Sequence, residues 1–189
     1  MSLFVNTFFE ERLQDLFNLA ARVEKALASA GIEYRVVGGL AAYLYVEEAE
    51  PDAGRLTRDI DITVRREDLP RIAEAVQPFG LEYRHVAGVD MLVQKDQPSA
   101  RRAVHMIFEG EKVRPEYPEP APKLGMGLKI KGIPLIPLAD LVRMKLTSYR
   151  LKDQAHLKDL DEQGLITPEI EAGFSPVLLE RLAKVRAHD

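Results

Sequence analysis

The sequence contains no cysteine among its 189 residues. Disulfide bonds, thiolate zinc sites and cysteine nucleophiles are therefore excluded. No apolar run reaches the length that spans a membrane, and the N-terminal residues lack the basic start and apolar stretch of a secretory signal. We therefore expect a cytoplasmic protein that has no membrane partner.

An excess of basic charge is also missing, because 26 Lys and Arg residues stand against 30 Asp and Glu residues. A broad nucleic-acid-binding surface is not expected at a formal net charge of −4, and any basic patch would be local. The composition, 46% hydrophobic and 30% charged, is typical of a globular chain that buries a substantial core. We find no internal repeat and expect one domain with a helical C-terminal part.

Apolar residues at three- and four-residue steps predict a long first helix over residues 8–30, with Asn6 or Thr7 as its cap and Gly31 at its end. Strands and helices then alternate. The predicted elements are a strand over 34–37, a helix over 40–48, a strand over 59–64 and a helix over 66–77.

The middle of the chain is rich in strand patterns. Residues 81–86 and 89–94 predict a hairpin around the turn Ala87-Gly88, and residues 103–108 predict a further strand. The proline-rich residues 115–122 predict a semi-rigid connector.

Residues 128–136 predict a short hairpin that returns to the sheet, and the remaining pattern is helical. The predicted helices cover about 138–149, 151–163 and 175–187. This order indicates an α+β fold, with a mixed β-sheet flanked by helices and a C-terminal helical portion. We expect a core over residues 1–136 and a helical portion over residues 137–189 that closes one side of a cleft.

The glycine pair Gly38-Gly39 follows a predicted strand and opens a predicted helix. Glycines at such a junction let the backbone approach a ligand closely, and a helix N-terminus offers N–H groups to an anion. Taken alone, a glycine pair is equally compatible with an ordinary tight turn.

Two carboxylates, Asp59 and Asp61, alternate with apolar residues on the strand that follows. The alternation places both on one face of the strand, where like charges repel unless a cation lies between them. A solvated sheet face is the plainer interpretation of these aspartates. Together with the glycine pair, however, they predict a site for Mg²⁺ or Mn²⁺ that also contacts nucleotide phosphates.

These motifs resemble the DNA polymerase β-like nucleotidyltransferase superfamily. Its pattern is a Gly-Gly or Gly-Ser pair at the start of a helix and then Asp-x-Asp on the next strand, as in Gly38-Gly39 and Asp59-Ile60-Asp61. Residues 136–146 and 150–153 also resemble the branch of abortive-infection type nucleotidyltransferase toxins. The resemblance implies transfer of a nucleoside monophosphate from an NTP to a hydroxyl of an acceptor, which is tRNA, a protein or a small molecule.

The superfamily carries a third carboxylate on a later strand, and His105 occupies that position here. A histidine binds divalent metals but suits Mg²⁺ poorly. Neutral, it is a candidate general base towards the acceptor hydroxyl; protonated, it would pair with the aspartates in place of a metal. Asp90, Glu109 and Glu111 are nearby carboxylates that could substitute for it.

Three functional hypotheses remain open. The first is a metal-dependent nucleotidyltransferase in which Asp59, Asp61 and His105 are catalytic. The second is a catalytically impaired nucleotide-binding module, one partner of a toxin–antitoxin or other regulatory pair, and the substitution at His105 favours it. The third is a structural protein whose aspartates are solvated.

Two cations complete the predicted nucleotide site. Lys145 lies on a mostly apolar helix stripe, so it either extends along the core to reach water or directs a point charge at a triphosphate. Arg58 is either an ion-pair partner of its neighbours or a second phosphate contact. Four polar residues on adjacent turns of the next helix predict a set of ion pairs and hydrogen bonds: Lys152, Asp153, His156 and Asp159.

Overall fold

The structure, a computed structural model, describes residues 3–55, 57–99 and 102–187, and gives residues 3–9 as backbone only. Its centre is a five-stranded sheet with the strand order β1-β2-β5-β4-β3. The strands are β1 (Arg35–Val37), β2 (Ile60–Val64), β3 (Leu81–Val86), β4 (Val89–Gln94) and β5 (Val104–Phe108).

The sheet is mixed, as the sequence predicts. β2 and β5 pair in parallel at its centre, whereas β1 with β2, β5 with β4 and β4 with β3 pair antiparallel. β3 and β4 form the hairpin expected around Ala87-Gly88. In the central pair, Asp61 lies opposite His105, so residues far apart in the chain share one face of the sheet.

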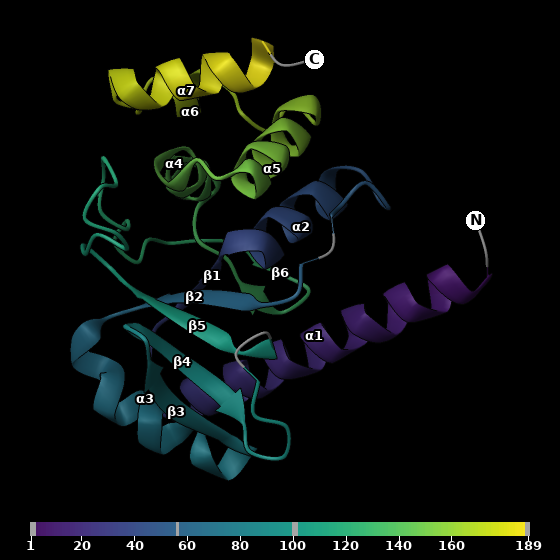
Figure 1. Cartoon of the computed structure of the whole chain (residues 1–189), viewed down its shortest axis with the longest axis vertical. Coiled ribbons are helices and arrows are strands. Elements are labelled where there is room, and N and C mark those ends of the chain that lie inside the picture. Colours follow the sequence, from purple (N-terminus) through teal and green to yellow (C-terminus); the bar gives the residue numbers. More distant parts are fainter. Residues whose placement is uncertain (1–2, 56, 100–101, 188–189) are drawn as a thin grey trace.

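Helices cover the sheet in two groups (Figure 1). α2 lies between the sheet and the C-terminal helices. α1 and α3 pack against each other, and α3 contacts β3 at the edge of the sheet. The helices are α1 (Leu3–Ser29), α2 (Gly38–Ala49), α3 (Leu69–Ala75), α4 (Leu138–Ser148), α5 (Leu151–Glu162), α6 (Pro168–Glu171) and α7 (Pro176–Ala187).

Three short elements complete the fold. The 3₁₀ turns η1 (Arg66–Asp68) and η2 (Gln77–Phe79) flank α3. β6 (Lys129–Ile130) and β7 (Ile133–Pro134) form the predicted hairpin as a separate two-stranded sheet. Leu135, just beyond it, bridges in parallel to Val36 of β1, which confirms that this segment returns to the main sheet.

Two predicted helix boundaries are wrong. The first helix begins at Leu3, so Asn6 and Thr7 lie inside it and do not cap it. The helix predicted over 66–77 is divided into η1, α3 and η2. Pro70 stands in the first turn of α3 and Pro78 in the first turn of η2. The N–H groups of a first turn have no partner within the helix, so proline, which lacks an N–H, is tolerated there. Further inside a helix it would interrupt the hydrogen bonding.

The hydrophobic core continues from the sheet through α2 into the C-terminal helices. Leu40 and Leu44 of α2 are fully buried, as are Leu141 and Leu146 of α4, in the same core cluster. The Tyr45 hydroxyl in α2 donates a 2.7 Å hydrogen bond to the carbonyl of Ile136. The domain boundary at residue 136 remains a prediction, and the apolar core crosses it without interruption.

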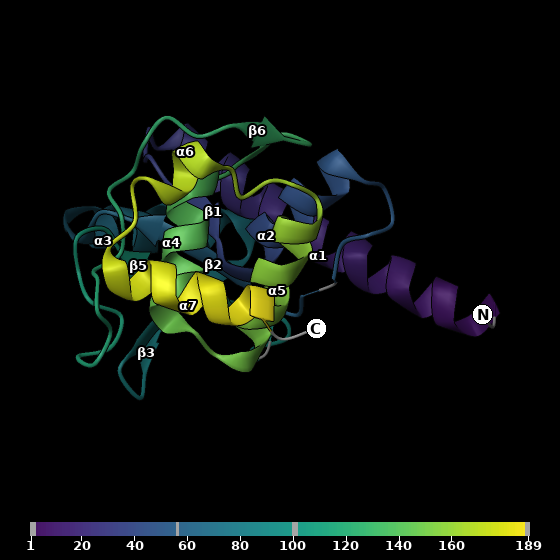
Figure 2. The same ribbon diagram turned by 90° about the horizontal axis from the view of Figure 1, so that it is seen from above.

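One arginine of α1 is bonded to the sheet edge. Arg22 donates to the carbonyls of Phe79 and Gly80 and to the side-chain oxygen of Gln94. The N-terminal part of α1 extends beyond the rest of the molecule (Figure 2). Among the described residues, no helix combines the length and apolar character needed to cross a lipid bilayer.

The last helix is joined to α4 through Arg181. Its guanidinium donates to the carbonyls of Leu146 and Thr147 at 2.7 and 2.8 Å and lies 5.1 Å from the centre of the Tyr149 ring. Carbonyls in the last turn of a helix have no partner within the helix, so Arg181 satisfies groups that the helix cannot.

We predict that Arg181→Ala lowers the free energy of unfolding by about 1–3 kcal/mol, because it leaves charge-assisted hydrogen bonds unmade. Urea denaturation measures the change as a shift of the midpoint at constant slope. Lys184→Ala is the control on the same helix: it breaks only the exposed pair with Glu180 and should leave the midpoint almost unchanged. Equal midpoints for the two variants would contradict the structural role of Arg181.

Candidate functional site

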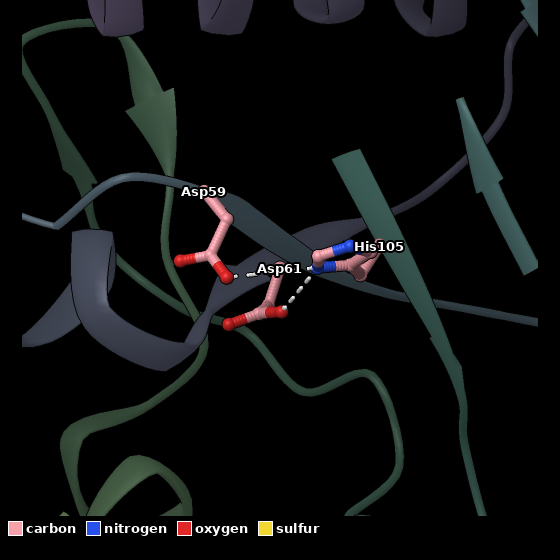
Figure 3. A group of neighbouring side chains, drawn as sticks. All are labelled: Asp59, Asp61 and His105. Carbon is pink, nitrogen blue, oxygen red and sulfur yellow. Dashed lines mark ion pairs between the residues drawn. The ribbon is translucent and has the colours of Figure 1, made fainter. Parts of the chain in front are cut away.

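Asp59, Asp61 and His105 converge at the centre of the sheet. One ligand atom from each lies within 4.8 Å of the others. The His105 Nδ1 atom is 3.4 Å from the Asp61 carboxylate and 3.8 Å from the Asp59 carboxylate, and all three side chains point toward one another (Figure 3). Val104 and Met106 are buried on the opposite face of β5. The expectation that His105 faces the carboxylates is confirmed.

The glycine pair makes room for the two carboxylates. Gly38 has a φ of +68°, and a Cβ atom there would lie 2.0 Å from Asp61 Oδ2. A Cβ atom on Gly39 would lie 2.6 Å from the hydroxyl of Thr57, which donates a 3.1 Å hydrogen bond to Asp59. The first turn of α2 therefore packs directly against the groups that hold and orient the aspartates.

A cavity of about 500 Å³ opens beside these residues. Its walls come from β2, β5, α4, the start of α5 and the segment 111–121. Gly38, Asp59, Asp61, His105 and Lys145 all line it, so one cavity brings together five of the seven site residues predicted from the sequence.

Lys145 is a buried cation. Its side chain is 3% exposed, which rules out the expectation that it extends to water. Its Nζ atom donates a 2.8 Å hydrogen bond to His156 Nδ1 and lies 3.6 Å from the Asp153 carboxylate. Burial lowers the pKa of Lys145 to about 8, against the opposing attraction of Asp153 and Asp61, so the ammonium stays charged at neutral pH.

His156 acts as the acceptor in that hydrogen bond. Burial, followed by repulsion from Lys145, lowers the pKa of His156 to about 4. The imidazole is therefore neutral at pH 7, and its Nδ1 atom accepts from Lys145. Its Cε1 atom would be 3.6 Å from a Cβ on Gly39, so His156 lies between the lysine and the start of α2.

Asp153 joins Lys145 to the start of α5. Its carboxylate accepts hydrogen bonds from the Arg150 side chain at 2.7 Å, the Ser148 hydroxyl at 2.8 Å and the Arg150 backbone N–H at 3.3 Å. Burial alone would raise the pKa of Asp153, but Arg150 and Lys145 hold it below its ordinary value. Asp159 is paired to Arg55 at 2.6 Å, so the predicted ion pairs and hydrogen bonds are confirmed for Asp153, His156 and Asp159, with partners that lie outside α5.

Arg58 and Gly39 are the two predicted site residues that do not line the cavity. Arg58 is exposed and does not line the cavity, whereas Arg150, to which sequence reasoning gave no role, does. Arg66 also lines it, with its guanidinium 3.7 Å from the centre of the Phe108 ring and paired with Glu111. Gly39 is buried in the first turn of α2. Arg150 could have been identified from its position three residues before Asp153, at the start of a predicted helix. That spacing is typical of a capping box, which Arg150 and Asp153 form at the start of α5.

We predict that Gly38→Ala destabilises the protein more than Gly164→Ala does. Gly164 has a similar φ of +67°, but a Cβ atom added there would meet nothing within 4 Å, so its variant suffers only backbone strain of about 1 kcal/mol. Gly38→Ala adds displacement of Asp61, worth a further 1–3 kcal/mol or so. Thermal and urea unfolding measure both. Equal destabilisation would mean that Asp61 moves away at no cost.

No protein-family model matches the chain, and no curated protein sequence matches it. Solved structures do. An antigenic nucleotidyltransferase-like protein from Paracoccidioides brasiliensis is similar with a TM-score of 0.61 and 19% identity, over 93% of this chain and 89% of that one. The antibiotic-resistance factor ANT(2'')-Ia is similar with a TM-score of 0.50 and 12% identity, over 93% and 84% of the two chains. The abortive-infection branch stays a prediction. The chain has the nucleotidyltransferase fold that the resemblance to the DNA polymerase β-like superfamily implies.

Proposed function

We propose that the protein transfers a nucleoside monophosphate from an NTP to a hydroxyl group of an acceptor and releases pyrophosphate. The observation that carries the proposal is that Asp59, Asp61, His105 and Lys145 line one cavity in a chain with the nucleotidyltransferase fold. A cavity of about 500 Å³ is in the range of small-molecule sites.

The donor set fits a divalent cation. Two half-buried carboxylates and an imidazole nitrogen offer three ligand atoms within 4.8 Å of one another. Asp59 and Asp61 would hold the ion, with the Thr57 hydroxyl orienting Asp59. A divalent cation supplies neutralisation of the phosphate charge, including the charge that develops on the leaving pyrophosphate.

The positive wall of the cavity suits the triphosphate. Lys145 presents a charge whose attraction for an anion is stronger in the buried site than in water, and Arg150 lies beside it on the same wall. Arg150 therefore takes the role that the sequence suggests for Arg58. Gly38, which lines the cavity, begins α2, where N–H groups favour an anion.

The acceptor hydroxyl must lose its proton as its oxygen attacks the α-phosphorus. Asp59, Asp61 and His105 are cavity groups at the carboxylate cluster that can accept that proton. The resemblance to the superfamily implies tRNA, a protein or a small molecule as the acceptor.

A second candidate function is a nucleotide-binding module without transfer activity, such as one partner of a toxin–antitoxin or other regulatory pair. The observation in its favour is that His105 Nδ1 lies within ion-pair distance of both aspartates, so that a protonated imidazole can take the place of a cation. Release of pyrophosphate from an NTP distinguishes the two functions, because only the transferase produces it.

We predict that Asp61→Asn abolishes divalent-metal-dependent NTP binding, because it removes one of two anionic ligands. Calorimetry with Mn²⁺ and each NTP measures the binding. Asp161→Asn is the matched control, because Asp161 pairs with Arg186 and does not line the cavity. Unchanged metal-dependent binding by the Asp61 variant would overturn the site assignment.

We predict that Lys145→Met weakens NTP binding at pH 7 by about tenfold or more, since hydrogen bonds to charged groups contribute roughly 1.5–3 kcal/mol. Because the pKa of Lys145 is lowered to about 8, its charge is present below that pH and is lost above it. The difference in affinity between wild type and variant should therefore shrink as pH rises through 8. A variant that loses stability but keeps its affinity would show that Lys145 only packs.

A further inference from the structure

We propose that His105 makes this a site for a divalent transition-metal ion with an affinity for nitrogen ligands, such as Co²⁺, Fe²⁺ or Zn²⁺, in preference to Mg²⁺. The inference rests on the proposed metal site at Asp59 and Asp61 and assigns its ion class. His105 is then the residue that determines selectivity.

The distances from the His105 imidazole to the two carboxylates are close to those between ligands of one ion. Ligand atoms about 2.1 Å from an ion and at right angles to each other lie roughly 3 Å apart. His105 Nδ1 is 3.4 Å from Asp61 Oδ1 and 3.8 Å from Asp59 Oδ2, so small side-chain rotations bring all three atoms onto one ion. The backbone need not move, because the parallel pairing of β2 and β5 fixes Asp61 opposite His105.

No nearby carboxylate among the described residues joins the cluster in place of the histidine. Asp90 is bound by the Tyr83 hydroxyl at 2.6 Å and by His85 at 2.8 Å. Both partners contact its Oδ1 atom, and Asp90 lines the cavity without being a member of the three-residue cluster. The cavity therefore offers Asp59 and Asp61 a nitrogen ligand instead of a third oxygen.

The other two candidates are also engaged. Glu109 accepts a 2.7 Å hydrogen bond from the backbone N–H of Leu124 and pairs with Arg65 at 3.4 Å. Glu111 is bound by the guanidinium of Arg66 through two hydrogen bonds. Both carboxylates thus stabilise the segment that follows β5, and an oxygen-only triad would require breaking those contacts.

This donor set discriminates between ions on two grounds. Mg²⁺ prefers oxygen ligands and gives up its waters reluctantly, whereas imidazole is a good ligand for Fe²⁺, Co²⁺ and Zn²⁺. A neutral imidazole also contributes no negative charge, so two carboxylates balance one divalent ion. The binding of Mg²⁺ depends more on charge than on covalency. Exchange of a carboxylate for an imidazole therefore lowers the affinity for Mg²⁺ more than the affinity for Fe²⁺, Co²⁺ or Zn²⁺.

The test uses the full chain without nucleotide. Calorimetric titration with Co²⁺ and with Mg²⁺ gives two dissociation constants, and the visible absorption of bound Co²⁺ reports its ligands. We expect wild type to bind Co²⁺ at least tenfold more tightly than Mg²⁺. His105→Asp should reduce that ratio at least tenfold and alter the Co²⁺ spectrum. Asp161→Asn is the control for adventitious binding, because Asp161 pairs with Arg186 and does not line the cavity, and it should change neither.

Equal affinity of wild type for the two ions would overturn the inference, as would an unchanged ratio in His105→Asp. If that variant does not fold, the wild-type ratio and spectrum decide. The proposed function fails by a different result, namely absence of pyrophosphate release with every metal. Pyrophosphate release with Mg²⁺ and no preference for Co²⁺ would overturn the selectivity while leaving the function intact.

Discussion

The close approach of Gly38 to Asp61 is the contact on which the rest of the structure depends. Only a residue without a Cβ atom lets the first turn of α2 lie against the carboxylate on β2. That position buries α2 between the sheet and the C-terminal helices. α4 and α5 then pack on α2. This packing places Lys145 of α4 at the cavity that Asp61 also lines. The contact between the Gly38 backbone and the Asp61 side chain thus aligns β2 with α4.

The cavity has opposite charges on two walls. Asp59 and Asp61 lie on the sheet side, whereas Lys145 and Arg150 lie on the helix side. Asp153 and His156 hold Lys145 in place from behind, the first as an anion and the second as a neutral acceptor. The polar groups beside the lysine are therefore bonded, as burial of charge requires, and the ammonium faces the site with its geometry fixed before any ligand arrives.

Much of this arrangement could be predicted from the sequence, because it follows from local patterns. Alternation along residues 59–64 placed the aspartates on one face, and strand order placed His105 beside them. The burial of Lys145 could not be predicted from local sequence patterns, because it depends on contacts of α4 with α5 and α2. The position of Arg58 outside the cavity could not be read either, because adjacency to Asp59 in the chain does not fix the direction of an exposed side chain. The packing role of the glycines likewise appears only in three dimensions.

The parallel pairing of β2 with β5 also constrains how the molecule assembles. β3 and β4 are neighbours in the chain and can pair early, but β2 meets β5 only after a crossover that contains α3 and that hairpin. Long-range pairing is slow because the chain loses loop entropy before it gains contacts. Asp61 and His105 are therefore apart until the two strands meet. The proposed metal site is complete only when the central pairing has formed, so an ion held there would mark chains that have completed the sheet.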